Sequence, residues 1–460
     1  MARGVRGGYG LGRACNEPCS RDIPTSSVLI RLLPVATRVP AASNDDQLMF
    51  PVATFLMFVI IATLVVGGWH AYLWSRLVRN TGLTGRARRI ATIVLTLLAL
   101  SLPVSLLLGH SSIGAAVRPA LMLGYGWIAV AFLILVLLLL ADVGRLAGWS
   151  ARKIAGAAPA DPERRRTMAR LAAGAAAVVG VGGSGYGAAR ALGTIPVERL
   201  RIALPRLPRS LSGTSIVQLT DLHIGPVLRR SFVERVVAQV NALSPDIVAI
   251  TGDLVDGPTR DLLSQVEPLR RLRAKYGVFF VTGNHEYYSG VEAWVAALPS
   301  LGIRVLRNER VTIGQGDESF DLAGVDDWSA SRRGNGHGSD VQAAVRGRDT
   351  SRELVLLAHQ PRSIWEAAKH GVSLQLSGHT HGGQVFPWTF FVLLQQPFVL
   401  GLHKVQQTLV YVSRGTGFWG PPVRLGAPPE ITELRLVTSE TSQSQGERVV
   451  AQTPGRGEGD

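Results

Sequence analysis

Cysteine is almost absent from this chain of 460 residues, which contains only Cys15 and Cys19. Because both lie near the N-terminus, no disulfide framework and no thiolate metal site can form in the rest of the chain. Any metal ion bound there must therefore have nitrogen and oxygen ligands.

Charged residues are also scarce, at 18% of the chain against 47% hydrophobic residues. The shortage is concentrated in the first 190 residues, where residues 50–75, 90–117 and 119–141 contain no charged side chain. Each run is long enough to cross a bilayer of about 30 Å as a helix. We therefore predict three transmembrane helices, since buried core helices of this length without any charge are uncommon.

A fourth apolar run, residues 171–189, is rich in glycine and alanine. One interpretation is a transmembrane helix that packs closely through small residues. The alternative is an internal export signal, with residues 165–168 (Arg-Arg-Thr-Met) before it and a cleavage site at residues 189–191. We favour a fourth span, because cleavage is less common at an internal position.

Acidic residues are fewer than basic ones, 33 against 48, and the formal net charge is +15. Such an excess can indicate nucleic-acid binding, but many arginines here flank the apolar runs, so we expect no nucleic-acid partner. The loops at 76–89 and 142–170 are strongly basic and should face the cytoplasm. Four spans then place the C-terminal domain outside the cytoplasm, whereas three would leave it inside.

The composition divides the chain into five parts. We expect a polar leader at 1–48, with Met49 as an alternative start; a membrane region at 49–192; a linker at 193–210; a folded domain at 211–438; and a disordered tail at 439–460.

The folded domain alternates short apolar strands with helical segments. Strands are predicted at residues 215–220, 246–251, 278–282, 354–358 and 373–377, and residues 232–243 have helical spacing. This alternation favours a layered α/β domain.

Each of these five strands is followed directly by carboxylate, amide or imidazole side chains. The blocks are Asp221-Leu222-His223, Gly252-Asp253-Leu254-Val255-Asp256, Gly283-Asn284-His285-Glu286, His359 and Gly378-His379-Thr380-His381. A single histidine usually has an ordinary structural role, but five such coincidences predict a site at the carboxyl ends of the strands. Two divalent metal ions need a shared anionic ligand, for which Asp253 is the natural candidate. Histidine and carboxylate ligands suit Mn, Fe, Zn or Co better than Ca or Mg.

The ordered pattern D-x-H, G-D-x-x-D, G-N-H, H, G-H-x-H over residues 221–381 resembles the calcineurin-like metallophosphoesterase superfamily. Residues 413–417, 421–424 and 429–431 resemble a membrane-attached bacterial branch of that superfamily. The resemblance implies a four-layer αββα sandwich behind an N-terminal transmembrane region.

The resemblance also implies a role for each site residue. One metal ion would be held by Asp221, His223, Asp253 and His381, and the other by Asp253, Asn284, His359 and His379. His285 would face the substrate and be oriented by Asp256. The implied reaction is hydrolysis of a phosphoester by water activated between the two ions, with His285 stabilising the transition state or protonating the leaving oxygen.

Phosphoprotein phosphatases of the superfamily carry a phosphate-binding arginine after the second block, whereas this chain has Gly257 and Pro258. We therefore expect a phosphodiesterase or phosphatase that acts at the membrane on a phospholipid or a lipid-linked phosphate. The alternatives are a non-catalytic metal-binding scaffold, against which the complete ligand set argues, and a membrane sensor or transporter. Uncharged first three spans are unsuited to ion transport. Metal identity and oligomeric state are left open.

Two further features have alternative interpretations. Residues 382–402 contain no charged side chain and follow the last metal-binding block; we prefer a buried segment that covers the sheet over an apolar lip that enters a membrane or holds acyl chains. Asp326 and Asp327 follow another predicted strand at 320–325 and could support the site or cap a helix.

Overall fold

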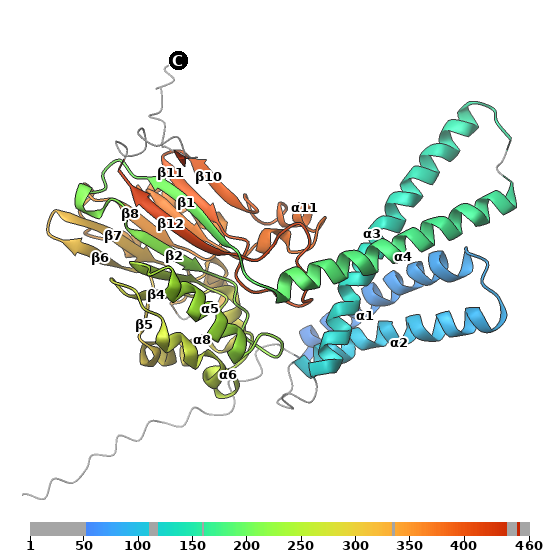
Figure 1. The fold of residues 1–460 in the computed structure, drawn as a ribbon, viewed down its shortest axis with the longest axis horizontal. Coiled ribbons are helices and arrows are strands. Elements are labelled where there is room, and N and C mark those ends of the chain that lie inside the picture. The colour runs from blue at the N-terminus through green and yellow to red at the C-terminus, as the bar shows by residue number, and fades with distance from the viewer. Residues whose placement is uncertain (1–51, 110–117, 159–160, 334–335, 439–448, 451–460) are drawn as a thin grey trace, which may run out of the picture. The chain divides into compact units, whose positions relative to one another are not determined.

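The computed structural model describes residues 52–109, 118–158, 161–333, 336–438 and 449–450 (Figure 1). The predicted leader and almost all of the predicted tail lie outside these residues. The chain divides into two compact units, Met1–Phe58 and Val59–Asp460. Only the first turns of helix α1 are described in the first unit, and every contact discussed below lies within the second.

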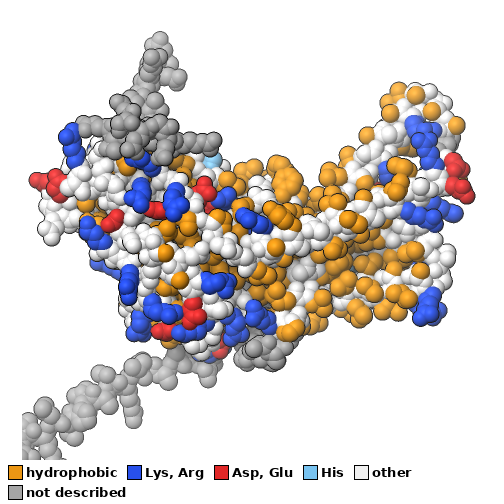
Figure 2. All heavy atoms as spheres, viewed as in Figure 1, with side chains coloured by type: hydrophobic (Ala, Val, Ile, Leu, Met, Phe, Trp, Pro, Cys, Tyr) orange, Lys and Arg blue, Asp and Glu red, His pale blue; other side chains and the backbone are white. Residues whose placement is uncertain are grey.

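The described parts of the four predicted apolar segments are all helical. They form α1 (Val52–Trp74), α2 (Gly85–Gly109), α3 (Arg118–Ile154) and α4 (Pro162–Leu192), and a π-helical turn, η2 (Ser75–Arg79), follows α1. In the described part of the chain, α2, α3 and α4 are long and apolar enough to cross a membrane. Exposed hydrophobic side chains lie along these helices (Figure 2). Helices α3 and α4 extend beyond the predicted spans at 119–141 and 171–189, mostly at their basic ends.

Helix α4 packs through small side chains, as its composition predicts. Its buried positions recur every three or four residues and are Ala169, Ala173, Ala176, Gly180, Ser184, Gly187 and Ala191. A Cβ atom at Gly180 would lie 2.5 Å from Cγ1 of Ile134 on α3. Small residues therefore let the two helices approach closely.

The strands of the described residues form two sheets. The first has the order β13-β1-β12-β2-β3-β4-β5 and the second β10-β11-β9-β8-β7-β6. The first contains β1 (Val197–Ala203), β2 (Ser215–Leu219), β3 (Ile247–Thr251), β4 (Val278–Val281), β5 (Ile303–Val305), β12 (Ile431–Val437) and β13 (Val449–Val450). The second contains β6 (Glu309–Gln315), β7 (Glu318–Gly324), β8 (Leu354–Leu357), β9 (Leu374–Ser377), β10 (Gly401–Val405) and β11 (Thr408–Val412).

Helices cover the outer face of each sheet. They are α5 (Arg230–Ala242), α6 (Thr259–Val266), α7 (Asn284–Ser289), α8 (Val291–Ala297), α9 (Val341–Val345) and α10 (Ile364–Lys369). A further short helix, α11 (Thr389–Val392), buries none of its residues. The 3-10 turns are η4 (Arg209–Leu211), η5 (Glu267–Arg271), η6 (Leu298–Leu301), η7 (Trp328–Arg333), η8 (Pro361–Ser363) and η9 (His381–Gly383).

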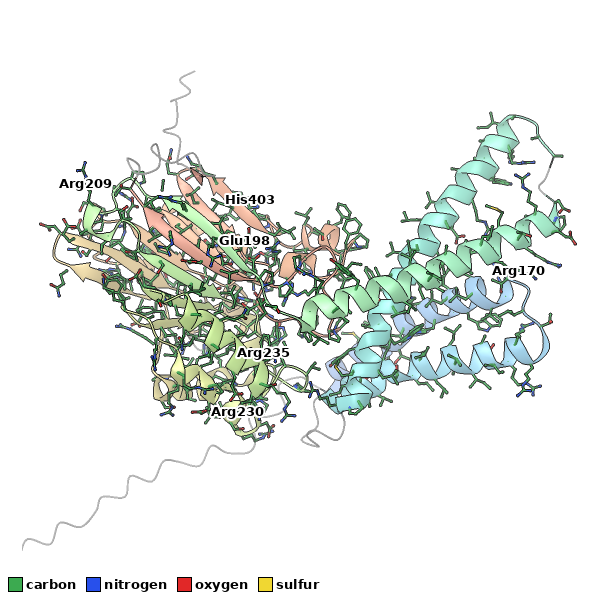
Figure 3. All side chains as sticks on the ribbon, in the orientation of Figure 1. Arg170, Glu198, Arg209, Arg230, Arg235 and His403 are labelled. Carbon is green, nitrogen blue, oxygen red and sulfur yellow. The ribbon has the colours of Figure 1, made fainter. Side chains whose placement is uncertain are left out.

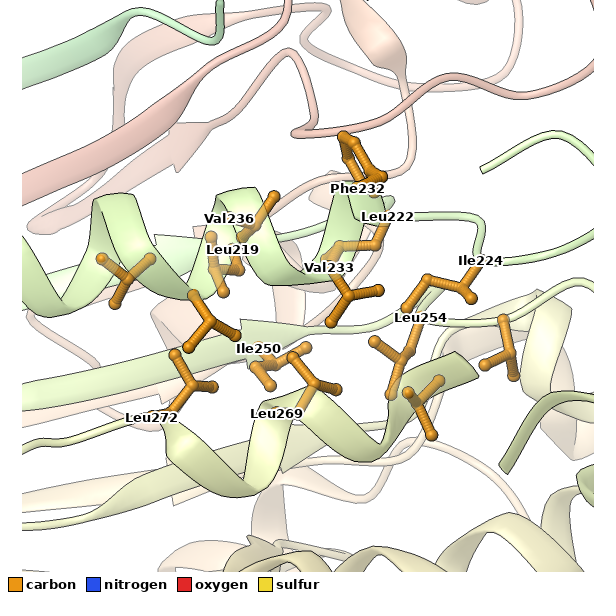
Figure 4. Close-up of a cluster of buried hydrophobic side chains, with 14 of the residues drawn as sticks. Leu219, Leu222, Ile224, Phe232, Val233, Val236, Ile250, Leu254, Leu269 and Leu272 are labelled. Carbon is orange, nitrogen blue, oxygen red and sulfur yellow. The ribbon is translucent and has the colours of Figure 1, made fainter. Parts of the chain in front are cut away.

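Separate apolar clusters join the layers. Side chains from both sheets, such as Ile216 of β2 and Leu376 of β9, form the central cluster. On the outer face of the first sheet, Val233 and Val236 of α5 pack over Ile250 of β3 (Figure 4). The same helix also carries Arg230 and Arg235 (Figure 3). A third cluster joins α9 and α10 to β7 and β8. The predicted four-layer αββα sandwich is confirmed.

The predicted linker at 193–210 is wrong over part of its length, because Val197–Ala203 form strand β1. This strand pairs in parallel with β12, from Val197 opposite Ile431 to Ala203 opposite Val437. Ile202 is buried, whereas Glu198, labelled in Figure 3, is exposed. Charged residues within a half-exposed strand explain why its sequence does not look like a buried one.

Candidate metal centre

The structure brings all nine predicted site residues together at one edge of the sandwich. Strands β2, β3 and β4 of the first sheet and β8 and β9 of the second end there. The residues that follow these strands are Asp221, His223, Asp253, Asp256, Asn284, His285, His359, His379 and His381. The five predicted strands are present, with ends that differ by at most one residue, so the side chains emerge where the sequence predicts.

Three overlapping groups of these side chains could each hold a metal ion. They are Asp221 with His223 and His381, Asp253 with His359 and His379, and His223 with Asp253 and His285; within each group the ligand atoms lie within 4.8 Å of one another. Asp253 belongs to two of the groups.

Several close contacts join nitrogen and oxygen atoms of the kinds that metal ions bind. Oδ2 of Asp253 lies 3.1 Å from Nε2 of His359, and Oδ1 of Asp221 lies 3.4 Å from Nε2 of His381. Nε2 of His223 and Nε2 of His381 are 3.0 Å apart. So many buried imidazoles and carboxylates at these distances match the donor set of a transition-metal centre.

Asn284 provides independent support for a metal ion. Its Oδ1 atom is buried and has no hydrogen-bond partner among the described residues. A buried carbonyl oxygen without a partner is rare and needs an explanation. A cation bound beside Asp253 would supply that partner, so the side chains present fit a metal ion.

The backbone is strained at five of these positions. Asp221, His223, Asp253, His379 and His381 have φ angles between 48° and 72°, a region that residues other than glycine seldom adopt. Hydrogen bonds hold these turns in place: the Asp221 N–H donates to Gly252 O at 3.1 Å, and the His379 N–H donates to the Asp221 carboxylate at 3.0 Å. The surrounding structure thus turns each side chain towards the common centre.

Two glycines of the sequence pattern are required by close packing. A Cβ atom at Gly283 would lie 2.2 Å from Oδ1 of Asp253, and one at Gly378 would lie 2.2 Å from Oδ2 of Asp221. Any larger residue would push a carboxylate out of the site. This explains the glycines in the G-N-H and G-H-x-H blocks.

Asp256 orients two histidines at once. Its Oδ1 accepts hydrogen bonds from Nδ1 of His223 at 2.9 Å and Nδ1 of His285 at 2.7 Å. Both rings therefore keep Nε2 turned towards Asp253, at 3.9 Å and 4.0 Å from its Oδ2. Burial opposes ionisation of Asp256, but the attraction of the two imidazoles outweighs it and holds the pKa of Asp256 below its usual value.

The histidines divide into charged and neutral ones. Burial lowers the pKa of His285, but the nearby Asp253 and Asp256 carboxylates outweigh burial and raise it to about 9. Burial, together with the charge on His359, lowers the pKa of His379 to about 3. His379 is therefore neutral near pH 7, which is the form that binds a metal ion. Asp253 outweighs burial and raises the pKa of His359, so a metal ion would have to displace the proton of His359. Two exposed aromatic rings, Trp419 and Tyr288, flank His285, with centroids 5.6 Å and 5.2 Å from its ring.

Two charged residues that sequence reasoning did not single out also shape the site. Buried Glu286 accepts the backbone N–H groups of Asp253 at 3.0 Å, Leu254 at 2.8 Å and Gly283 at 2.7 Å. Buried Arg424 donates to the His381 carbonyl at 2.8 Å and to Nδ1 of the same histidine at 3.0 Å. In the sequence, only their positions indicate a role at the site: Glu286 directly follows the G-N-H block, and Arg424 lies within the run at 421–424.

Asp326 and Asp327 lie outside the candidate metal groups of the described residues. Asp326 pairs with Arg307 at 2.8 Å. Asp327 accepts the Ser329 N–H at 2.8 Å at the start of η7, so it acts as the predicted cap.

Comparison with known proteins agrees with this geometry. A family model described as calcineurin-like phosphoesterase matches residues 214–383, which include all nine site residues. A transmembrane protein with a metallophosphoesterase domain from Danio rerio is 42% identical over 55% of this chain and 59% of its own length. An uncharacterised metallophosphoesterase from Aquifex aeolicus is 37% identical over 52% of this chain and 91% of its own length. One from Bacillus subtilis is 32% identical over 58% and 93%.

The matched part covers less than two thirds of the length of several relatives. The chain spans 59%, 56% and 64% of the Danio rerio, Bos taurus and Helicobacter pylori relatives. Relatives from vertebrates as well as bacteria show that the likeness extends beyond a bacterial branch.

Proposed function

Because the chain belongs to the calcineurin-like phosphoesterase family, we propose that it hydrolyses phosphoesters with water at the centre built around Asp253. The observation that carries the proposal is that Asp253 belongs to two ligand groups, one with His359 and His379 and one with His223 and His285. A carboxylate shared in this way is what a pair of metal ions requires.

In this proposal two divalent ions are bound, drawn from Mn, Fe, Zn or Co. Asp221, His223, Asp253 and His381 hold one ion, and Asp253, Asn284, His359 and His379 hold the other. When bound, the ions supply Lewis-acid chemistry towards a phosphoryl oxygen and a water molecule.

The chain's own contribution centres on His285. The carboxylate of Asp256 fixes its Nδ1 at 2.7 Å, which leaves Nε2 directed into the site. The nearby Asp253 and Asp256 carboxylates outweigh burial and raise the pKa of this imidazole, so they favour its protonated form. His285 is thus suited to donate a hydrogen bond to the phosphoryl group or a proton to the leaving oxygen.

We further propose that the substrate is a phosphodiester or a lipid-linked phosphate and that the protein acts at a membrane. Three described helices of spanning length and the name of the Danio rerio relative support the location. The basic loops favour a domain outside the cytoplasm.

The substrate class rests on the position after the second sequence block, where this chain has Gly257 and not a phosphate-binding arginine. The Gly257 N–H donates to Ser289 Oγ at 3.0 Å, and the Gly257 carbonyl accepts from Trp294 Nε1 at 3.0 Å.

The first test compares full-length protein with the Asp253→Asn variant. Both are supplied in turn with Mn, Zn, Fe and Mg and assayed on a phosphomonoester, a chromogenic phosphodiester and phospholipid vesicles. The substitution removes the shared charge, so metal-dependent hydrolysis should be lost. Asp261→Asn, an exposed position on α6, is the control and should behave like the unmodified protein.

Near-normal turnover by the Asp253→Asn variant would refute the site. Stoichiometric metal binding by the unmodified protein without hydrolysis of any ester would instead support the scaffold alternative.

A further inference from the structure

Residues 385–394, called the lip below, expose an unusual amount of apolar surface. Our preferred prediction that residues 382–402 are a buried cover for the sheet is wrong for this part. Six large side chains are 50–82% exposed, namely Phe386, Trp388, Phe390, Phe391, Leu393 and Leu394. The helix α11 within the lip buries none of its residues. Exposed patches of this kind mark interaction surfaces.

The lip contacts the middle of helix α3. The rings of Trp388 and Phe132 are 5.9 Å apart at an edge-to-face angle, and Val385 packs in one cluster with Ala129 and Leu133. Phe132 lies ten residues before Asp142, the next charged residue along α3, which is about 15 Å along the helix axis. An apolar layer about 30 Å thick around α3 would therefore include the level of the lip.

We propose that the lip inserts into the lipid bilayer beside α3; this rests on the membrane location in the proposed function. The lip contains no charged residue, so its insertion into the apolar layer would remove no charged side chain from water. Five of its six exposed large side chains are phenylalanine or leucine, which are stabilised by transfer from water into an apolar environment. Exposed apolar side chains of α3, such as Leu139 and Leu140, continue the surface along the helix.

The lip is directly connected to the candidate metal centre. The turn η9, which contains His381, ends two residues before it. Gln384 Nε2 donates to the Trp419 carbonyl at 2.8 Å, and the Trp419 N–H donates back to Gln384 Oε1 at 3.1 Å. Trp419 in turn contacts His285. The lip therefore identifies the substrate class as an amphiphile whose phosphoester reaches His285 while its acyl chains remain in the bilayer.

The insertion is tested without measuring activity. Cys15 and Cys19 are replaced by serine, and a single cysteine introduced by Phe391→Cys in the lip or Leu263→Cys on α6 is labelled with an environment-sensitive fluorophore. The full chain is reconstituted in phosphatidylcholine vesicles with acyl chains brominated at defined depths. Bromine should quench and bilayer burial should blue-shift the probe at 391 but not at 263. Equal quenching at the two positions would overturn the proposal.

The substrate class is tested with the variant Phe390→Ser/Leu394→Ser. Hydrolysis of phospholipid in vesicles should fall about tenfold or more, since less apolar surface holds the lip in the bilayer, whereas hydrolysis of a soluble chromogenic diester should stay within about twofold. Equal effects on both substrates would overturn the lip's role towards lipid. If the unmodified chain hydrolyses no phosphoester, the proposed function fails, while the quenching experiment still decides insertion.

Discussion

At the scale of single residues, the candidate centre depends on side chains that serve two partners. Asp256 accepts from His223 and from His285, so one carboxylate fixes both a proposed metal ligand and the proposed acid. Glu286 similarly binds the backbone of Asp253 and of Gly283. A change at either acidic residue should therefore affect more than one property.

Substitution of Asp256 should weaken metal binding as well as catalysis. In Asp256→Asn, a neutral amide oxygen accepts more weakly than the carboxylate does and the amide nitrogen cannot accept, so the His223 ring is held less firmly and metal affinity should fall about 10- to 100-fold. His285→Gln is the comparison: turnover should fall about 10²- to 10⁴-fold while metal affinity stays unchanged. Metal titration and steady-state kinetics measure both. Unaltered metal affinity in Asp256→Asn would show that His223 does not depend on this carboxylate.

Substitution of Glu286 should reduce stability. In Glu286→Gln, an amide group replaces one oxygen that accepts backbone N–H groups, which leaves buried donors facing a donor. The expected cost in the free energy of unfolding is about 1–3 kcal/mol. Thermal unfolding in detergent measures it, with Glu292→Gln as control because that side chain is 68% exposed. Equal melting temperatures for the two variants would contradict the anchoring role.

At the scale of elements, helix α4 is joined to the candidate centre through the segment that carries Arg424. The Arg424 N–H donates to the Gly187 carbonyl at 2.9 Å, and Arg424 holds His381 through its carbonyl and its ring. Arg424 thus links Gly187, near the end of α4, to His381, a proposed metal ligand.

Gly187→Ala should therefore lower activity. Its Cβ would lie 2.5 Å from Cγ1 of Val423, so the segment with Arg424 must shift, at a cost typical of overpacking, about 1–3 kcal/mol. Hydrolysis of a soluble diester should fall severalfold. Gly185→Ala, on the same helix with nothing within 4 Å, should leave it unchanged. Identical kinetics for the two variants would rule out this connection.

The elements that the sequence predicts best are those with a strong local pattern. The five apolar strands and the helix at 232–243 are buried on at least one face, so their hydrophobic spacing shows directly in the sequence. Strand β1 was missed because its place depends on pairing with β12, more than 200 residues away. The exposure of the lip was missed for a related reason: an uncharged run has the same composition whether it covers a sheet or faces lipid.

At the scale of the whole molecule, the sequence predicts which residues lie together at the strand ends better than it predicts what surrounds them. The nine site residues follow five predicted strands, and parallel strands bring their carboxyl ends to one edge. Glu286 and Arg424 belong to no periodic pattern, and only the folded chain shows that they are buried beside the proposed ligands Asp253 and His381.

The proposed topology makes a prediction about the intact cell. If α1 to α4 all span, the basic loops at 76–89 and 142–170 face the cytoplasm and the sandwich faces outward. In protein without Cys15 and Cys19, a cysteine introduced by Leu263→Cys should react with a membrane-impermeant maleimide in intact cells. A cysteine introduced by Gly156→Cys, in the second basic loop, is the control and should react only after lysis. The reverse pattern would place the sandwich in the cytoplasm.

The most direct test of the central claim is anomalous diffraction from crystals of the protein grown with manganese or zinc. The account predicts two anomalous peaks about 3.5–4 Å apart, with the Asp253 carboxylate between them, Asp221, His223 and His381 around one, and Asn284, His359 and His379 around the other. A single peak, or peaks that do not involve Asp253, would contradict it.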